Sequence, residues 1–216
     1  MNLSKRLQAV ATLVDVGRKV IDVGCDHAYL DIYLTLNNEN KCIATDINEN
    51  ALNSAIKNIE KHNLTDKIEV KLTDGLTDIK VNKKDNIVIC GMGTHTILDI
   101  LKTNKLSNTL IISSNNDIDI LRREVVSLGY FIDSEIFIID KGKPYIIIKF
   151  KKGYKKYNEN DYIFGPILKY NIQYKKYIIN KYKKIIKQIS IKKINIKFKY
   201  ILLILRLKLL DIKIDF

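Results

Sequence analysis

Cysteine is scarce in this 216-residue chain, and its placement argues against a zinc site or a disulfide framework. The three cysteines, Cys25, Cys42 and Cys90, lack the short paired spacing that zinc sites use. Each lies in or beside an apolar run, which indicates buried, reduced thiols. We therefore expect a cytoplasmic protein that holds no metal.

The sequence also shows no targeting or membrane-spanning segment. Residues 3–16 are amphipathic and carry Lys5, Arg6 and Asp15, unlike a signal peptide. The apolar run at residues 201–205 is far too short to cross a bilayer and is followed by Arg206 and Lys208. We expect no membrane partner.

Glycine is missing where a dinucleotide-binding motif needs it. Residues 20–30 read as a short buried strand, a turn at Gly24 and a helix start, an arrangement that can hold a nucleotide-like ligand. The fingerprint G-x-G-x-x-G would need glycines at positions 26 and 29, where the chain has Asp26 and Tyr29. Because Asp26 would repel a pyrophosphate, a nucleotide-dependent dehydrogenase is disfavoured.

The acids near this turn favour a cationic cofactor instead. About twenty residues further on, a second strand-like run ends at Asp46, where a carboxylate can accept hydrogen bonds from ribose hydroxyls. S-adenosylmethionine has no phosphate and carries a cationic sulfonium and an amino group, which suit Asp22, Asp26, Asp46 and Asp74. The methyltransferase motif D-x-G-x-G-x-G is met from Asp22 only as D-x-G-x-D-x-A.

The candidate cofactor site extends over the ends of several predicted strands. Asp74 would bind the adenine amino group, although an ordinary Asp-Gly turn explains this residue equally well. The residues expected to contact S-adenosylmethionine are Asp22, Gly24, Cys25, Asp26, His27, Asp46, Ile47, Asp74, Gly75, Gly91, Met92 and Gly93.

Strands and helices alternate along the first 150 residues. Strands are expected from residue 20 and at 41–46, 68–72, 86–90 and 109–113, and helices at 3–16, 28–37, 48–62, 95–101 and 118–128. This alternation predicts an α/β fold with a mostly parallel sheet and helices on both faces. Residues 130–139 and 144–150 flank a four-residue loop containing a glycine, which predicts an antiparallel hairpin. A sheet closed in this way is the layout of class I, Rossmann-like methyltransferases.

The positive charge is confined to the last third of the chain. Residues 1–150 hold 19 Lys and Arg against 20 Asp and Glu, whereas residues 151–216 hold 18 against 4, giving the net +13. Tyrosines are interleaved with these lysines, a pattern typical of a surface that binds a polyanion. A bias towards AT-rich codons would also enrich lysine and tyrosine, but it would not leave residues 1–150 neutral.

Two amphipathic helices are predicted in this basic segment, which we expect to form a second domain at residues 153–216 beside a methyltransferase domain at 1–152. One apolar stripe contains Tyr174, Ile178, Tyr182, Ile185 and Ile189, and the other contains Ile194, Phe198, Ile201, Leu205, Leu209 and Ile212. A turn near Ser190 would make a coiled-coil-like antiparallel hairpin. No strong helix breaker marks this turn, so one long helix, which would self-associate through exposed isoleucines, is the alternative to the expected monomer.

The end of the fourth strand bears on the reaction. Enzymes that methylate the exocyclic amine of adenine carry Asn/Asp-Pro-Pro-Tyr/Phe there, whereas this chain has Gly91-Met92-Gly93. Adenine N1 already has a free lone pair, so its methylation needs no strong base, and a carboxylate could stabilise the developing cation. Asp26 is the leading catalytic candidate. His27 could act as an acid or base, or simply pair with backbone, and Tyr29 could stack on a base or face the core.

Several motifs together resemble the bacterial tRNA (adenine-22-N1)-methyltransferases, the TrmK family. They are Asp22-Val-Gly-Cys-Asp-His-Ala-Tyr-Leu30, Asp46-Ile-Asn-Glu-Asn-Ala-Leu52, Asp74-Gly-Leu76, Cys90-Gly-Met-Gly93, Leu121-Arg122, Gly129-Tyr130, Gly142-Lys-Pro-Tyr145 and Phe164-Gly-Pro-x-Leu168. The resemblance covers residues 2–170 and extends to the helical segment by architecture only. It implies N1 methylation of an adenine in the D-loop region of tRNA, with S-adenosylmethionine as methyl donor and helices that help to grip tRNA.

Two positions depart from the family pattern. The family commonly has Gln-Pro-Asn after the fifth strand, where this chain has Ser113-Ser114-Asn115, so Asn115 is the residue expected to present the base. Thr94 replaces the last glycine of Gly-Met-Gly-Gly and is expected to add bulk and a hydroxyl at the pocket edge. The alternatives are a methyltransferase that acts on another RNA or on a small molecule, and an inactive RNA-binding protein.

Overall fold

The computed structural model describes residues 3–189 and 193–210. The chain divides into two compact units, a sheet unit at residues 1–155 and a helical unit at residues 156–216.

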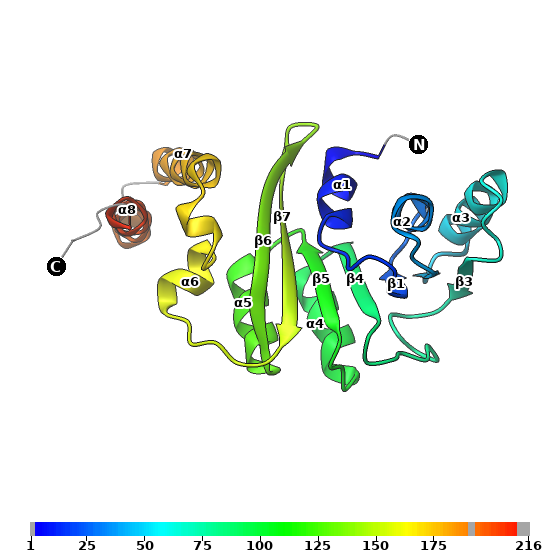
Figure 1. Cartoon of the computed structure of the whole chain (residues 1–216). Helices are drawn as coiled ribbons and strands as arrows, with labels where there is room; N and C mark the ends of the chain where they lie inside the picture. The colour runs from blue at the N-terminus through cyan, green and yellow to red at the C-terminus, as the bar shows by residue number, and fades with distance from the viewer. Residues whose placement is uncertain (1–2, 190–192, 211–216) are drawn as a thin grey trace. The chain divides into compact units, whose positions relative to one another are not determined.

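The sheet unit contains one seven-stranded sheet in the order β3-β2-β1-β4-β5-β7-β6 (Figure 1). The strands are β1 (Val20–Val23), β2 (Cys42–Asp46), β3 (Ile68–Leu72), β4 (Asn86–Met92), β5 (Thr109–Ser114), β6 (Tyr130–Asp140) and β7 (Lys143–Lys152). β1 to β5 pair in parallel, and β7 runs antiparallel to both β5 and β6. The carboxyl ends of five strands therefore meet along one edge, at which the polar residues singled out above are found.

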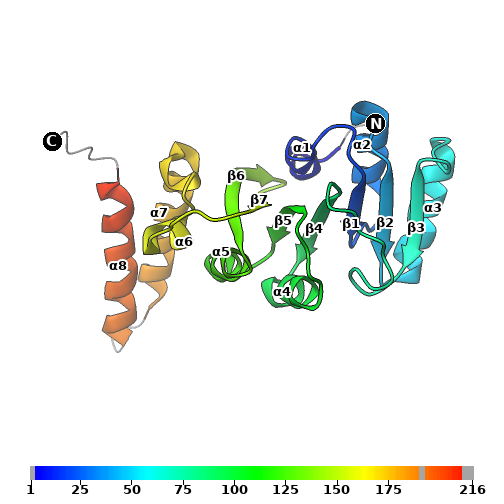
Figure 2. The ribbon, with the colours of Figure 1, turned by 60° about the horizontal axis from the view of Figure 1, so that its bottom comes forward.

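Helices cover both faces of the sheet. α1 (Lys5–Ala11), α2 (Tyr29–Asn38) and α3 (Glu49–Lys61) form one layer, and α4 (Thr94–Thr103) and α5 (Ile118–Ser127) form the other, as Figure 2 shows most clearly for α1, α4 and α5. The burial of the central strand explains why the strand segments of the sequence are continuous apolar runs. Ile21 of β1 pairs with Ile43 of β2 and Ile87 of β4, and the β1 residues are buried on both faces. The predicted Rossmann-like methyltransferase fold is confirmed.

The closing hairpin is tighter than predicted. β6 continues to Asp140 and β7 starts at Lys143, so only Lys141 and Gly142 form the turn, with φ of 48° and 77°. Positive φ at both central residues is the requirement of a type I′ turn, whose twist matches that of the flanking strands. β4 also runs past its expected end at Cys90 as far as Met92, which pairs with Ser114 after a bulge between Cys90 and Met92.

The N-terminal segment is fastened to this distant hairpin. The Arg6 amide donates to Asp140 Oδ2 at 3.2 Å, at the hairpin tip, and the Arg6 guanidinium carbon lies 5.4 Å from the centre of the Tyr145 ring. Lys149 Nζ of β7 pairs with Asp15 Oδ1 at 2.6 Å. These contacts join residues more than a hundred positions apart and fix α1 beside the carboxyl edge of the sheet.

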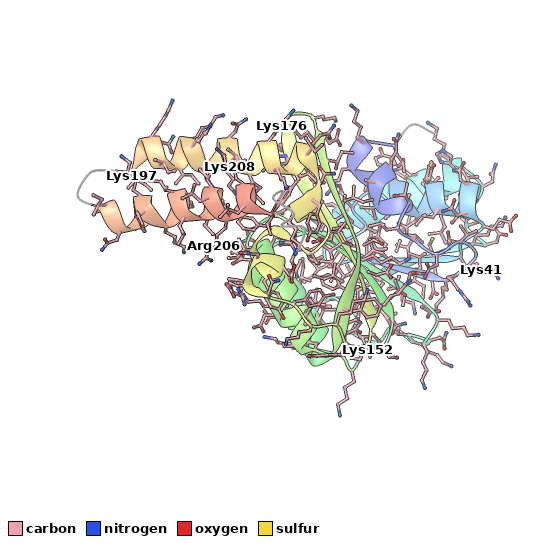
Figure 3. The ribbon with its side chains drawn as sticks, turned by 60° about the vertical axis from the view of Figure 1, so that its left-hand side comes forward. Lys41, Lys152, Lys176, Lys197, Arg206 and Lys208 are labelled. Atoms are coloured by element: carbon pink, nitrogen blue, oxygen red, sulfur yellow. The ribbon has the colours of Figure 1, made fainter. Side chains whose placement is uncertain are left out.

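The helical unit contains α6 (Glu159–Phe164), a short 3₁₀ turn η1 (Leu168–Tyr170), α7 (Ile172–Gln188) and α8 (Ile194–Leu209). α6 begins with a capping box between Asn158 and Asp161. α7 and α8 pack side by side, and the rings of Tyr182 and Tyr200 lie 5.2 Å apart (Figure 3). The helices therefore form a pair and not one long helix, although the turn expected near Ser190 falls outside the described residues.

The predicted inner face of α8 is wrong. Ile194, Phe198, Ile201, Leu205 and Leu209 are 39–65% exposed, whereas Leu203, Ile204 and Leu207 are the buried residues of α8. α8 is apolar on almost every side, so two different stripes have helical spacing and spacing alone does not choose between them. In α7, where lysines occupy the other faces, the stripe was correctly located: Tyr174 and Ile178 are buried.

Candidate functional site

The loop between β1 and α2 has an unusual backbone. Gly24, Asp26 and Ala28 alternate in the left-handed region, with φ of 81°, 54° and 56°. A Cβ at Gly24 would also come within 2.6 Å of the methyl carbon of the flexible Met92 side chain, which would have to shift, and the positive φ itself favours glycine here. Ala28 precedes α2 and no side chain caps that helix, which leaves its first N–H groups available at the sheet edge.

Asp46 connects this loop to β2. Its Oδ2 accepts from the Asp26 amide at 3.2 Å and its Oδ1 accepts from the Asn48 amide at 2.9 Å. The amides of Gly24 and Cys25 donate to the Thr45 carbonyl at 2.8 and 2.9 Å. Since each carboxylate oxygen has two lone pairs, Asp46 still has acceptor capacity towards a ligand after these bonds are made.

Three further predicted residues lie beside Asp46. Ile47 follows it and is 71% exposed, so it presents an apolar surface next to the carboxylate. Asp74 lies after β3, whose end is held to β2 by a 3.0 Å bond from the Thr73 amide to the Asp46 carbonyl. Gly75 has φ of 61° and lies against Ile100, so a larger residue would be strained and crowded there.

The end of β4 brings the glycine turn and Asn115 together. Gly91 lies at the bulge with φ of 87°, and Asn115 Nδ2 donates to its carbonyl at 2.7 Å. The Asn115 amide also donates to the Met92 carbonyl at 3.0 Å. Gly93 then caps α4. Asn115 is therefore held at the β4 end with its side chain exposed beside Gly91.

Thr94 does not extend the pocket edge as expected. It is fully buried, and its hydroxyl bonds to Ser114 Oγ at 2.8 Å and to the Asn116 carbonyl at 2.7 Å. The Thr94 amide donates to Asn116 Oδ1 at 2.9 Å. The hydroxyl that replaces a family glycine thus ties α4 to the loop after β5.

Asp26, His27 and Tyr29 form an exposed cluster at the start of α2. His27 Nε2 lies 3.5 Å from Asp26 Oδ1, and the His27 and Tyr29 rings are 5.5 Å apart. The His27 carbonyl accepts from Asn58 Nδ2 of α3 at 3.0 Å, which fixes the backbone under the cluster. Tyr29 is 43% exposed, so it does not face the core. These three side chains lie where a flat ligand could stack or receive a hydrogen bond.

A pair of buried acids lies beneath the loop. Asp22 and Asp31 are 5% and 0% exposed, and each carboxyl lies close enough to affect the pKa of the other. Burial raises the pKa of Asp22 to about 7, against the opposing influence of the Asp31 side chain and the Arg6 guanidinium. Burial and the neighbouring Asp22 raise the pKa of Asp31 well above its usual range. Near neutral pH the pair therefore carries less than two full negative charges, which lowers the cost of burying it.

Two cysteines lie at this edge, Cys25 buried and Cys90 partly buried, and both are protonated. Cys25 is 7% exposed, and burial raises its pKa far above the usual range. Burial raises the pKa of Cys90 to about 12, and the charge of Asp22 adds to this effect. Neither thiol is a nucleophile at neutral pH, so Cys25 belongs to the site through its backbone.

Arg6 and Tyr145 are residues of this edge that the sequence reasoning missed. The guanidinium lies near the end of β4, with Nη1 3.5 Å from the position that a Gly91 side chain would take. Its charge opposes the rise in pKa of both Asp22 and Cys90. In the sequence Arg6 looked like the polar face of an amphipathic helix, and no local signal placed it at this edge. Tyr145 belongs to a recognised motif, but the motif assigned it no role.

A metal site and a membrane-spanning helix are both absent from the described residues. Within residues 3–189 and 193–210, no group of three or more His, Cys, Asp or Glu side chains is arranged to hold a metal ion. Over the same residues, no helix combines the length and apolar character needed to cross a membrane.

Comparisons with known proteins agree with this geometry. A family model described as a methyltransferase domain matches residues 3–148. The tRNA (adenine(22)-N(1))-methyltransferase of Bacillus subtilis is 35% identical over 158 residues, which span 71% of this chain and 66% of that protein. The structure of M. capricolum TrmK with S-adenosyl-homocysteine aligns with a TM-score of 0.81 and 36% identity, covering 95% of this chain and 96% of that one. A Streptococcus pneumoniae structure with S-adenosyl-L-methionine aligns with a TM-score of 0.85 and 31% identity, covering 96% and 98%.

Proposed function

This chain belongs to the bacterial TrmK family of methyltransferases, and we propose that it transfers a methyl group from S-adenosylmethionine to N1 of adenine 22 in tRNA. The observation that carries the proposal is the junction of two strand ends at the carboxyl edge. There the loop of residues 24–28, whose Asp26 amide is bound by Asp46, meets the Gly91-Met92-Gly93 turn at the end of β4. Met92 of this turn lies against Gly24. The loop suits a nucleoside that carries positive charge, and the glycines at the end of β4 leave room for a flat base beside it.

The residues present fit S-adenosylmethionine. Asp46 retains acceptor capacity for ribose hydroxyls, and Gly24 allows close approach of the backbone. Asp26 and the Asp22–Asp31 pair make the edge attractive to cations. Arg6 supplies a positive charge at the same edge and would bind the cofactor carboxylate. Asp74 and Ile47 would contact the adenine ring of the cofactor.

The chemistry required of the protein is modest. When bound, the cofactor supplies an electrophilic methyl group, and adenine N1 supplies its own lone pair. Asn115, held at the Gly91 carbonyl, and Tyr29, exposed at the start of α2, would orient the base. Asp26 would stabilise the positive charge that develops on the adenine ring. His27 lies against Asp26 and would hold that carboxylate in place.

The helical unit is proposed as the part that grips tRNA. Its sequence is strongly basic, with 15 Lys and Arg against 4 Asp and Glu in residues 156–216. Lys176 of α7 and Lys197, Arg206 and Lys208 of α8 are among these cations (Figure 3). We assign the methyltransferase domain to residues 1–152 and the tRNA-gripping domain to 153–216, and place the reaction in the cytoplasm on a single copy of the chain.

The test is to incubate the protein with labelled S-adenosylmethionine and unmodified bulk tRNA, and to map the methyl group by nucleoside mass spectrometry. The expected product is 1-methyladenosine at position 22. A tRNA transcript with guanine at position 22 is the matched control and should remain unlabelled. Label in another RNA or in none, with the cofactor measurably bound, would overturn the assigned substrate.

A further inference from the structure

A second concave site lies in the sheet unit, at the edge opposite the loop of residues 24–28. It is a cavity of about 280 Å³ whose walls come from the end of α4, the end of α5, the start of β6 and the end of β7. β7 runs antiparallel to β5, so its last residues lie beside the first residues of β5: Phe150 pairs with Leu110. The cavity therefore opens at the amino edge of the parallel strands. Six β5 residues at about 3.3 Å each separate it from the carboxyl edge by roughly 16 Å or more.

Cations dominate the polar wall of this cavity. Lys102, Lys105 and Lys152 line it, and none of its lining residues is an acid. Such a cluster is notable in a unit that is close to neutral, with 22 basic and 20 acidic side chains in residues 1–155. Lys105 and Lys152 have no carboxylate partner among the lining residues, and ammonium groups in a concave, partly apolar setting attract an anion more strongly than the same groups would on open surface.

The three lysines are held differently. Lys152 Nζ donates to the Leu128 carbonyl at 2.7 Å and lies 4.3 Å from the centre of the Tyr130 ring (Figure 3 labels Lys152). Lys102 Nζ pairs with Glu124 at 2.8 Å outside the lining. Each ammonium has three N–H groups, so both retain donors for a ligand. Lys105, in the loop before β5, is exposed.

Tyr130 gives a second, independent indication of an absent anion. It lines the cavity and is 3% exposed, and its hydroxyl has no hydrogen-bond partner in the part of the chain that the structure describes. Burial raises its pKa to about 12, so the hydroxyl stays protonated and remains a donor. Buried polar groups are nearly always paired, and an unpaired one indicates a missing partner. Less than 1 Å² of the hydroxyl is exposed, so an anion bound among the lysines would accept from it only after a small shift of this wall.

We propose that this cavity at the amino edge of the sheet is a phosphate-binding site, formed by Lys102, Lys105 and Lys152 beside Tyr130. A phosphate is favoured over a carboxylate because it offers three or more acceptor oxygens to several ammonium groups arranged around it. Leu106 and Leu128 supply an apolar wall for whatever carries the phosphate. The source is either a free phosphate compound or a backbone phosphate of bound nucleic acid, and the second source rests on the proposed function.

The first arm of the test uses neither tRNA nor cofactor. Pyrophosphate is titrated into the ¹⁵N-labelled full chain while amide shifts are followed at residues 104–106 and 128–130. We expect saturable shifts with a Kd in the millimolar range or tighter. Lys105→Gln should weaken this binding at least fivefold. Lys41→Gln is the matched control, because Lys41 precedes β2 at the same amino edge but does not line the cavity (Figure 3).

The second arm identifies the source. If the phosphate belongs to tRNA, Lys105→Gln should weaken tRNA binding and reduce the slope of log affinity against log salt by about one, whereas Lys41→Gln should leave both unchanged. If it is a free compound, tRNA binding is the same in both variants while pyrophosphate binding still depends on Lys105. No saturable pyrophosphate binding, together with equal tRNA binding by the two variants, would overturn the proposal and leave the methyl-transfer assignment untouched.

Discussion

The sheet unit and the helical unit use charge and apolar residues in opposite ways. In the sheet unit, acids gather at the ends of strands and two of them are buried beneath the β1–α2 loop. The helical unit exposes lysines on both α7 and α8 and leaves many large apolar side chains of α8 in water. In the sheet unit, the acids form a small site whose side chains are held by hydrogen bonds. In the helical unit, the exposed lysines form a broad charged surface without such a defined site. The two units are therefore suited to a small cationic ligand and an extended anionic one, respectively.

The largest effect should follow from removing the acid that fixes the loop. Asp46→Ala deletes the acceptor of the Asp26 and Asn48 amides and the proposed ribose ligand. We expect cofactor affinity to fall about 100-fold or more by calorimetry, with tRNA affinity retained. Asp66→Ala, at an exposed acid outside the site, is the control. Equal cofactor affinity in the two variants would remove Asp46 from the site.

The inner face of the helix pair can be tested by stability. Leu207 is 0% exposed, so Leu207→Ala should cost about 2–4 kcal/mol of unfolding free energy, measured by urea denaturation followed by circular dichroism. Leu205, two positions away on the stripe that the sequence favoured, is 50% exposed, and Leu205→Ala should change stability by less than about 0.5 kcal/mol. If Leu205→Ala lost more unfolding free energy than Leu207→Ala, the buried face of α8 would be the one predicted from spacing.

The acid at the loop tip should matter for turnover more than for binding. Asp26→Asn removes the charge and keeps a residue that tolerates the φ of 54°. We expect single-turnover methylation to slow about tenfold to hundredfold, with cofactor and tRNA affinities close to those of the unaltered protein. Asp119→Asn, at an exposed acid in α5, is the control. A near-normal rate in Asp26→Asn would exclude a catalytic role for this carboxylate.

The basic helices should affect tRNA alone. Replacing Lys176, Lys197 and Lys208 by glutamine should weaken tRNA binding about tenfold and reduce the salt slope by as much as about 3, since each lost phosphate contact contributes about 0.9. The comparison variant replaces three exposed lysines of the sheet unit, Lys61, Lys67 and Lys83. If both triple variants lose the same affinity, the helices have no special part in binding.

The smallest effect concerns pH. Because the pKa of Asp22 is raised to about 7 in the folded protein, the folded state keeps a proton that the unfolded state releases near pH 4. Stability should therefore decline as pH rises from about 4 to about 7. Asp31→Asn replaces one acid of the pair by an amide that can donate to Asp22, so the decline in urea midpoint between pH 5 and 8 should become shallower. An unchanged slope would mean that the pair does not cause the decline in stability over this pH range.

The fold of the sheet unit was largely predictable, because alternating strands and helices have two distinct periods. The positions of Asp46, Gly24 and Asp26 also followed from sequence, since strand ends and glycine turns have local signals. Arg6 and Tyr145 did not, because their place at the carboxyl edge depends on long-range packing of α1 against the β6–β7 hairpin. Thr94 was misplaced because a residue type alone does not show whether its hydroxyl faces a pocket or Ser114. In α8 the apolar pattern was present but ambiguous.

The contacts between the first residues and the closing hairpin also constrain the order in which the protein can fold during synthesis. Arg6 bonds to Asp140, and Asp15 pairs with Lys149. A nascent chain that has not yet delivered β7 from the ribosome leaves α1 without these partners and β5 with an open edge. The sheet unit can close only after about residue 150 has emerged, while the basic helices are still being made. Newly made chains should therefore resist proteolysis abruptly, at the length that completes the hairpin.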